Sequence, residues 1–165
     1  MNQSSDYEII IIGAGAVGLA VARALANSGK GSVLVVEKEE TFGRGISSRN
    51  SEVIHSGIYY KPGSLKAINC RRGINLLLEF CNPHDVPYDM CGKVIVATSK
   101  EELKPLDFLH ERGQQNDIKG IKILSAPELQ EYEPHAAGLS ALYCPETGII
   151  DYRQVCEQLS ENIQK

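Results

Sequence analysis

The fold is decided by the stretch from Tyr7 to Glu37, which reads YEIIIIGAGAVGLAVARALANSGKGSVLVVE. Residues 8–12 are dominated by β-branched apolar side chains, which is typical of a strand buried on both faces. Residues 17–26 are rich in Ala and Leu at helical spacing, and residues 32–36 predict a second buried strand. The order of strand, glycine turn, helix, strand and acid indicates a dinucleotide-binding βαβ unit.

The glycine turn, residues 13–18, has the spacing that a bound pyrophosphate requires. Gly13 permits the tight turn out of the strand, and Gly15 has no side chain that would hold a phosphate away from the backbone. Gly18 lets the helix pack closely on the sheet, while the helix N-terminus offers unpaired N–H groups and the positive end of its dipole. We therefore predict a cofactor-binding turn made of Gly13, Ala14, Gly15, Ala16, Val17 and Gly18.

The acid at the end of the second strand is placed to bind a ribose. Glu37 lies 19 positions after Gly18, close to the separation of about 20 that is expected for such an acid. We predict that Glu37 and the adjacent Lys38 belong to the cofactor site. An acid here disfavours a 2′-phosphate, so FAD and NAD both stay open and NADP is disfavoured. The alternative at this point is an ordinary βαβ turn that binds no nucleotide.

Length and composition bound the class of protein. The chain has 165 residues, of which 42% are apolar and 23% charged, and its net charge is −4. Such a composition is ordinary for a globular domain, and the net charge gives no electrostatic reason to expect a nucleic acid partner. No apolar run approaches the length of a membrane span. Residues 1–6 lack the basic region and apolar core of a signal or transit peptide, so we expect neither.

The five cysteines are scattered along the chain and contain no C-x-x-C pair. This pattern favours buried thiols in a reducing compartment over a disulfide framework or a metal site. We therefore predict no metal site and a cytoplasmic location.

A second anion-binding element is predicted after the polar loop that follows Glu37. Ser47 or Ser48 is suited to cap a short helix, whose first turn would present polar and basic groups to a pyrophosphate or ribityl chain. The predicted ligands are Ser48, Arg49, Asn50 and Ser51. The alternative is a capped polar loop without a ligand.

The rest of the chain alternates between helices and strands of a different character. Ser64 is predicted to cap a helix over residues 65–81, with Arg71 and Arg72 directed towards water and an apolar stripe on the other side. That stripe consists of Leu65, Ile68, Ile74, Leu77, Leu78 and Cys81. Further strands are predicted at residues 92–98, 121–124, 139–143 and 148–151, and further helices at residues 99–116, from residue 125, and at 152–164.

These elements predict an α/β fold in which a Rossmann-like βαβ unit is interleaved with part of an α+β domain. We assign residues 1–90 to the N-terminal part of the cofactor domain, residues 91–150 to part of a substrate domain, and residues 151–165 to a helix that returns to the cofactor domain. Only two strands of a parallel sheet are evident, whereas such sheets have several more. We therefore expect the chain to be the N-terminal portion of a longer protein.

Four segments carry a resemblance to a known family. They are RNS at 49–51, IHSGIYYKPGSLKA at 54–67, CGKVIVA at 91–97 and TGIIDYRQV at 147–155. Together they resemble the signature of the L-2-hydroxyglutarate dehydrogenases and oxidases, flavoenzymes of the D-amino-acid-oxidase-like superfamily. Glu52 departs from the pattern, because glycine is common there in the family, and the backbone or charge near the flavin is then expected to differ.

The resemblance implies FAD as the cofactor, held by residues 13–18, by Glu37 and by residues 48–51. It also implies oxidation of a small 2-hydroxy acid, L-2-hydroxyglutarate above all, to a 2-oxo acid, with hydride passing to the flavin. The electron acceptor and the substrate-binding arginines are expected outside the chain. The alternatives are a related amine or glycerol-phosphate oxidoreductase and a catalytically incomplete nucleotide-binding fragment.

His55 is the candidate catalytic residue. A lone histidine is more often structural than catalytic, but the resemblance makes His55 a candidate for the base that removes the hydroxyl proton, or for a hydrogen bond beside the flavin. Tyr59 and Tyr60 are candidates to line the same site, and packing beside the turn is their alternative role.

Overall fold

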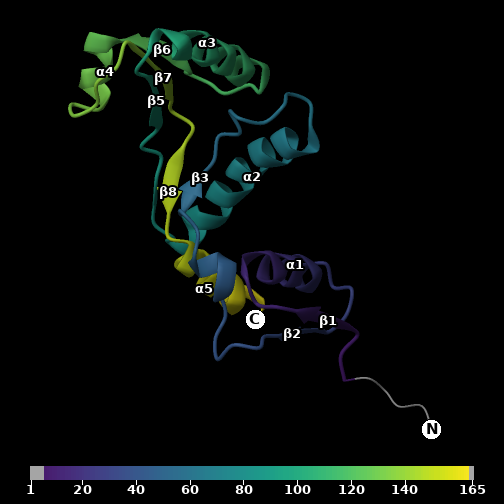
Figure 1. Cartoon of the computed structure of the whole chain (residues 1–165). Helices are drawn as coiled ribbons and strands as arrows, with labels where there is room; N and C mark the ends of the chain where they lie inside the picture. Colours follow the sequence, from purple (N-terminus) through teal and green to yellow (C-terminus); the bar gives the residue numbers. More distant parts are fainter. Residues whose placement is uncertain (1–5, 164–165) are drawn as a thin grey trace. The chain divides into compact units, whose positions relative to one another are not determined.

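The computed structural model describes residues 6–163, which divide into two compact units (Figure 1). Within the described range, unit 1 consists of residues 6–52, 84–87 and 151–163, and unit 2 consists of Val53–Pro83 and Tyr88–Ile150. Residues 1–5, within the segment for which the sequence predicts no targeting signal, and the last residue of the predicted C-terminal helix lie outside the described range.

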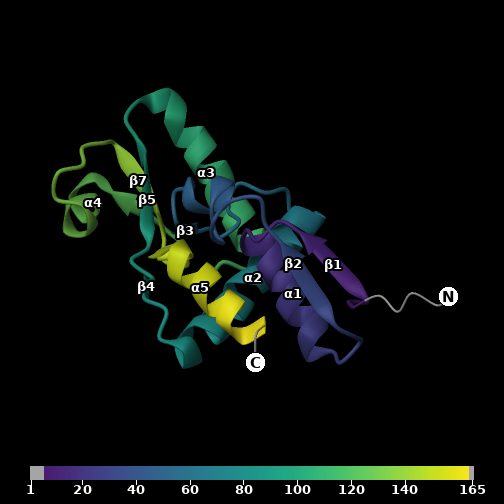
Figure 2. The same ribbon diagram turned by 90° about the horizontal axis from the view of Figure 1, so that it is seen from below.

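Unit 1 is built on the predicted βαβ unit. Strands β1 (Ile9–Ile12) and β2 (Val33–Val36) are joined by helix α1 (Ala16–Asn27) and pair in parallel, with Ile9 opposite Val33 and Ile12 opposite Val36. Figures 1 and 2 both show α1 running beside the two strands. Helix α5 (Tyr152–Ile163) packs against α1. The parallel pair and the returning C-terminal helix therefore bring the two ends of the described chain into one unit.

The β1 strand is covered on one face only, which differs from the prediction of a strand buried on both. Ile11 faces α1, because a Cβ built on Gly18 of that helix would lie 3.6 Å from the Ile11 side chain. Ile10 and Ile12 point the other way and are 60% and 90% exposed. Because all four residues are isoleucine, the sequence carries no alternation that would reveal which face is covered.

Unit 2 contains two small antiparallel sheets and three helices. The strand order of the first sheet is β3-β8-β4 and that of the second is β5-β7-β6. The elements are β3 (Val53–Ile54), α2 (Leu65–Cys81), β4 (Tyr88–Asp89), β5 (Lys93–Ala97), α3 (Lys100–Gln115), β6 (Lys122–Ser125), α4 (Ala126–Tyr132), β7 (Ser140–Cys144) and β8 (Gly148–Ile150). The consecutive strands β7 and β8 belong to different sheets, which their alternating sequences do not reveal.

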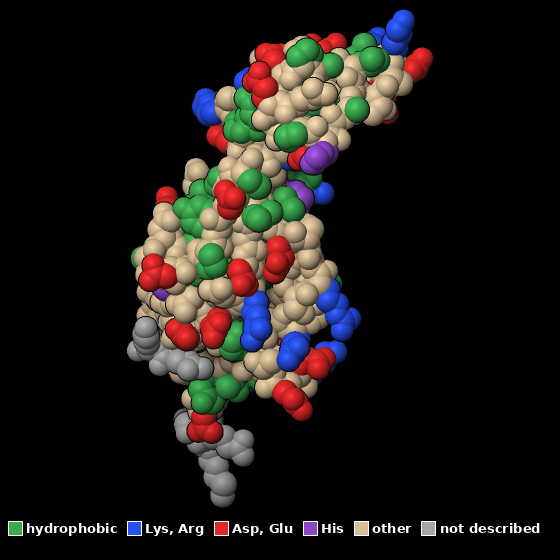
Figure 3. Space-filling model, turned by 90° about the vertical axis from the view of Figure 1, so that its left-hand side faces the viewer, with side chains coloured by type: hydrophobic (Ala, Val, Ile, Leu, Met, Phe, Trp, Pro, Cys, Tyr) green, Lys and Arg blue, Asp and Glu red, His purple; other side chains and the backbone are tan. Residues whose placement is uncertain are grey.

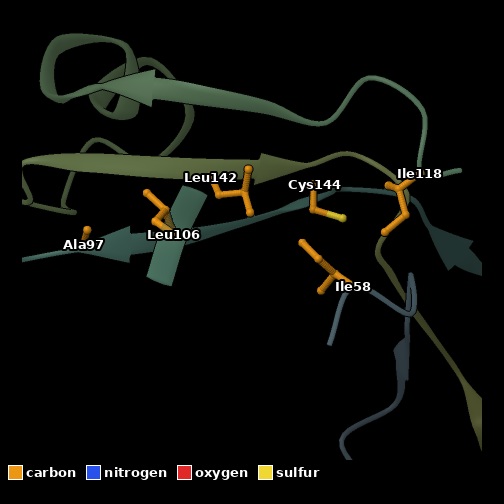
Figure 4. Close-up of a cluster of buried hydrophobic side chains, with 6 residues drawn as sticks. All are labelled: Ile58, Ala97, Leu106, Ile118, Leu142 and Cys144. Atoms are coloured by element: carbon orange, nitrogen blue, oxygen red, sulfur yellow. The ribbon is translucent and has the colours of Figure 1, made fainter. Parts of the chain in front are cut away.

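The core of unit 2 lies between its second sheet and α3. It is formed by Ile58, Ala97, Leu106, Ile118, Leu142 and Cys144, as Figure 4 shows. A smaller cluster lies between the second sheet and α4. It consists of Leu124 on β6, Leu129 on α4 and Ala141 on β7. Ile58 comes from the segment that follows β3 and points towards Cys144, so this segment is anchored in the core.

Helix α2 begins as predicted, and the predicted stripe is only partly correct: Ile74 and Cys81 are buried, but the N-terminal members of the stripe are not. The Ser64 hydroxyl accepts a hydrogen bond from the Ala67 amide at 3.2 Å and caps the helix. The buried side chains of the helix are Ala67, Ile74, Phe80 and Cys81, whereas Leu65 and Ile68 of the predicted stripe are exposed. Arg71, predicted to face water, forms an ion pair with Glu146 at 2.5 Å. Arg72 is exposed as predicted.

Helix α3 tolerates an internal proline. It starts at Lys100 with a capping box between Ser99 and Glu102, and Pro105 lies inside it. The helix therefore runs through the proline, within the predicted range of residues 99–116. Proline near the N-terminal end removes one intrahelical donor, and the capping box satisfies two others.

The predicted domains and the compact units divide the chain at different points. Residues 53–83 join residues 88–150 in unit 2, because β3 pairs with β8 and Ile58 lies in the core of that unit. Residues 151–163 join unit 1 through the packing of α5 on α1. The assignment of a cofactor domain and a substrate domain stays a prediction.

The surface and the cysteines complete this description. On the face seen in Figure 3, acidic and basic side chains are mixed with hydrophobic ones. Among residues 6–163 no helix is both long and apolar enough to cross a bilayer, and no three His, Cys, Asp or Glu side chains are grouped as metal ligands. All five cysteines are free; Cys81, Cys144 and Cys156 are buried as predicted, but Cys70 is only partly buried and Cys91 is exposed.

Candidate functional site

The glycine turn of unit 1 has the geometry that its spacing predicts. Gly13 has a φ of +101°, which glycine adopts readily and other residues avoid, and its amide donates to the Val36 carbonyl at 2.7 Å. A Cβ on Gly18 would overlap the carbonyl oxygen of Gly13. The third glycine is therefore required by the turn itself as well as by packing of the helix on the sheet.

Glu37 ties the end of β2 to this turn. One carboxylate oxygen accepts from the Ala14 amide at 2.7 Å, and the other accepts from the amides of Lys38 at 2.8 Å and Glu39 at 3.1 Å. These bonds, that from Ala14 first, hold the pKa of Glu37 below its ordinary value. The residue predicted from its distance to Gly18 is thus an ionised, oriented carboxylate beside the turn.

A short 3-10 helix, η1 (Gly45–Ser48), contacts the start of α1. The Ser47 hydroxyl accepts a hydrogen bond from the amide of Ala16, the first residue of α1, at 3.0 Å. A Cβ on Gly15 would lie 3.0 Å from the same hydroxyl. Ser47 is therefore part of the candidate site although the sequence identifies it only as a possible cap, since its contact spans 31 positions along the chain.

The predicted capped helix over residues 48–51 does not form. Ser47 and Ser48 lie inside η1, whose N-cap is Arg44 without a side-chain bond. Asn50 instead shapes the loop that follows, because its side chain donates to the Ser47 carbonyl at 2.9 Å and accepts from the Glu52 amide at 2.7 Å. The physical reason is that Gly45 permits an earlier turn, with a φ of +72°.

The four predicted ligands of this segment, Ser48, Arg49, Asn50 and Ser51, are exposed. Ser48 also lines a hollow of about 210 Å³ within unit 1. The other lining residues are Thr41, Phe42, Gly43, Arg44, Arg153 and Glu157. Their contact with a cofactor stays a prediction.

The turn fits the diphosphate of a dinucleotide. The amides in the first turn of a helix have no acceptor within the helix. Ser47 accepts from Ala16, and the helix itself offers no acceptor to the amides of Val17 and Gly18. These donors, the positive end of the dipole and the bare Cα of Gly15 make an anion cradle.

His55 lies in unit 2, directly after β3, and its side chain is exposed. Among the described residues its ring has no hydrogen-bond partner. Nearby, the Lys93 ammonium lies 4.5 Å from the centroid of the Tyr59 ring, and the Lys66 ammonium lies 4.5 Å from that of Tyr60. The tyrosines predicted to line the site thus each carry a cation on the ring face.

A parallel βαβ unit that brings a glycine turn, a helix N-terminus and an anchored acid together defines a dinucleotide-binding protein with a Rossmann-like fold. The family model described as DAO, FAD dependent oxidoreductase, matches residues 8–165. The chain therefore belongs to the FAD-dependent oxidoreductase (DAO) family. FAD is the cofactor of this family, so the choice between FAD and NAD is settled, and the predicted fold class is confirmed.

Curated relatives confirm the resemblance stated from the sequence. The chain is 45% identical over 160 residues to L-2-hydroxyglutarate dehydrogenase of Indibacter alkaliphilus, which covers 96% of the chain and 40% of the relative. It is 44% identical over 163 residues to the mitochondrial L-2-hydroxyglutarate dehydrogenase of Homo sapiens, covering 98% and 35%. The chain thus spans about 35% to 40% of the length of these relatives.

Solved structures agree on the fold. An L-α-glycerophosphate oxidase from Mycoplasma pneumoniae with FAD bound has a TM-score of 0.86 and 30% identity, with 96% of this chain and 42% of that one covered. A glycine oxidase from Geobacillus kaustophilus has a TM-score of 0.84 at 22% identity, with 96% and 44% covered.

Proposed function

We propose that this chain forms the FAD-binding part of an oxidoreductase that oxidises a 2-hydroxy acid, and that its substrate is L-2-hydroxyglutarate, which becomes 2-oxoglutarate. The observation that carries the cofactor part is the anion cradle at the start of α1, where Gly15 and the first-turn amides meet Ser47. The substrate part is supported by the 45% identity to the Indibacter dehydrogenase.

The residues of unit 1 would hold FAD in distinct ways. The turn of Gly13, Ala14, Gly15, Ala16, Val17 and Gly18 would bind the diphosphate, and the ionised Glu37, beside Lys38, would accept hydrogen bonds from the ribose. The exposed segment of Ser48, Arg49, Asn50 and Ser51 would add a guanidinium charge and hydroxyl donors. Ser47 would keep η1 against the turn through its bond to Ala16.

His55 is proposed as the general base. FAD, when bound, supplies the hydride acceptor. A ring nitrogen of His55 would take the proton of the C2 hydroxyl, which requires an accessible imidazole that is free to accept. The exposed ring without a hydrogen-bond partner meets this requirement.

Two other functions have support of their own. A glycerol-phosphate oxidoreductase is supported by the 30% identity to the Mycoplasma pneumoniae oxidase. A nucleotide-binding part without turnover is supported by the open face of β1, where Ile12 is 90% exposed.

Reduction of bound flavin distinguishes these functions. The purified chain is titrated with FAD, flavin fluorescence is followed, and the loaded protein is mixed without oxygen with L-2-hydroxyglutarate, its D enantiomer, glycerol 3-phosphate or glycine. Loss of oxidised-flavin absorbance with the L enantiomer alone is expected. If glycerol 3-phosphate or glycine reduces the flavin instead, that compound's class replaces L-2-hydroxyglutarate as the assigned substrate. A chain that binds no FAD would contradict the cofactor assignment.

Location and electron acceptor belong to the same proposal. The free cysteines support a reducing compartment, which we propose to be the cytoplasm. The names of the bovine and human relatives place those proteins in mitochondria. Fractionation with an antibody against the chain would decide between the two compartments, and turnover assays with oxygen or a soluble dye would identify the class of acceptor.

A further inference from the structure

The segment His55–Tyr60 is held by side chains at five of its six carbonyl groups. Surface loops normally direct most of their carbonyls to water. Here the donors come from helices α2 and α3 of unit 2 and from the C-cap residue of α3. We call these donors, Cys70, Arg71, Arg112 and Asn116, the carbonyl clamp.

Helix α2 supplies the first two donors. The Cys70 thiol donates to the His55 carbonyl at 2.9 Å, and the Arg71 guanidinium donates to the Ser56 carbonyl at 3.4 Å. Arg71 also donates to the Asp117 carbonyl at 3.2 Å and forms the ion pair with Glu146. One arginine therefore connects the segment to two other loops.

Helix α3 and its C-cap residue, Asn116, supply the other two donors. The Asn116 amide nitrogen donates to the Gly57 carbonyl at 3.1 Å and to the Tyr60 carbonyl at 2.9 Å, so both of its hydrogens are used. Asn116 is only 7% exposed. Arg112 donates to the Tyr59 carbonyl at 3.1 Å. A buried amide whose two donors both end on one segment fixes that segment strongly.

The side chains inside the segment add to this restraint. Ile58 is 1% exposed in the core, and the Ser56 hydroxyl lies 3.2 Å from the Cys144 thiol. Gly57 has a φ of +87° and lies close to Cys70. Only His55 and Tyr59 remain exposed.

We propose that the carbonyl clamp positions His55, so that Arg71 and Asn116 are positioning residues for the base. The inference rests on the proposed function for the role of His55. A reacting group must be held close to its productive geometry by a surrounding shell, and a displacement of about 1 Å can cost about 100-fold in rate. A backbone held at nearly every carbonyl presents one exposed imidazole with little freedom of the chain beneath it.

Adjacent residues offer matched controls. Arg71→Ala and Asn116→Ala remove clamp donors, whereas Arg72→Ala and Gln115→Ala remove exposed neighbours of like size on the same helices. Cys70→Ala removes one donor at a partly buried position and serves if a larger change prevents folding. Far-UV circular dichroism and Tm establish that each variant folds.

Amide exchange and ring NMR test the clamp without FAD. We expect exchange at residues 56–60 to rise by about 10-fold or more in the clamp variants. We expect the His55 ring to give one set of signals in the wild-type chain, and these signals to broaden or split in the clamp variants. The control variants are expected to match the wild-type chain. Unchanged exchange and unchanged ring signals in a folded clamp variant would overturn the proposal.

Turnover of the FAD-loaded protein then separates positioning from simple stability. We expect kcat to fall by about 10- to 100-fold while KM changes by less than about 3-fold. An unchanged kcat in a variant with faster exchange would overturn the positioning role. If the wild-type protein oxidises no 2-hydroxy acid, the proposed function fails, and the His55 ring signals alone decide whether the clamp orders the imidazole.

Discussion

The two candidate regions of the molecule are built in opposite ways. The cofactor turn of unit 1 is made almost entirely of backbone groups within residues 13–18, with glycines at the points of closest approach. The His55 segment of unit 2 is held by side chains that lie 15 to 59 positions away along the chain. A site made of local backbone groups can be recognised from a short sequence motif, whereas a site held by distant side chains leaves no such motif.

The largest effect is expected at His55. His55→Gln removes the proposed base but keeps a polar side chain of similar reach, so turnover of the FAD-loaded protein should fall by about 100- to 10,000-fold. FAD affinity should not change, because the cradle is formed by residues 13–18. Steady-state kinetics measure turnover, and flavin fluorescence measures FAD affinity. The control is His135→Gln, which changes another exposed histidine. Full turnover in His55→Gln would show that His55 is not the general base.

The cofactor turn is tested by Gly15→Val. The added side chain meets the Ser47 hydroxyl and the space required by a diphosphate, so FAD affinity should fall by about 100-fold or more. Flavin fluorescence titration gives the affinity. Gly73→Val provides the comparison, because a Cβ on Gly73 has no neighbour within 4 Å. Equal FAD affinity in the two variants would contradict the diphosphate site.

A smaller effect is expected at Glu52, where φ is +53°. A side chain in this left-handed region is strained, and glycine is not. Glu52→Gly should therefore stabilise the chain by about 0.5–1 kcal/mol. Urea denaturation measures the difference, with Glu40→Gly, at an exposed position without a positive φ, expected to stabilise nothing. A lower midpoint for Glu52→Gly would show that the carboxylate outweighs the strain.

The smallest effect concerns the pH dependence contributed by Glu37. Backbone amides, that of Ala14 first, lower the pKa of this carboxyl in the folded chain. A lowered folded pKa gives stability that is present above the unfolded value of about 4.3 and is lost as pH falls through the folded pKa. Urea midpoints from pH 7 to pH 3 should therefore decline less in Glu37→Gln than in the wild-type chain. Parallel curves would mean that the amide bonds add no pH dependence.

The same two regions show which parts of the candidate site could be predicted from the sequence. The spacing of Gly13, Gly15, Gly18 and Glu37 identified the turn, because each position has a backbone requirement that few residue types satisfy. Ser47 was visible only as a cap, since its acceptor role depends on how the loop closes onto α1. Asn116 gave no signal at all, because an asparagine at the end of a helix is ordinary and its partners lie more than 50 positions away.

Side-chain direction was harder to predict than element type. The helix over Leu65–Cys81 has several apolar residues on more than one face, so the stripe chosen from spacing included Leu65 and Ile68, which are exposed. The strands at residues 140–144 and 148–150 were evident from their composition. Their membership in two different sheets depends on non-local pairing with β5 and β4, which single strands do not encode.

The open face of β1 has a practical consequence for every solution experiment on this chain. Ile10 and Ile12 present apolar surface on a two-stranded sheet, and exposed strands of this kind promote association between molecules. Colloidal behaviour will therefore depend on protein concentration. Titrations are best made on dilute samples with light scattering recorded alongside, so that a change in flavin fluorescence is not confused with clustering of the protein.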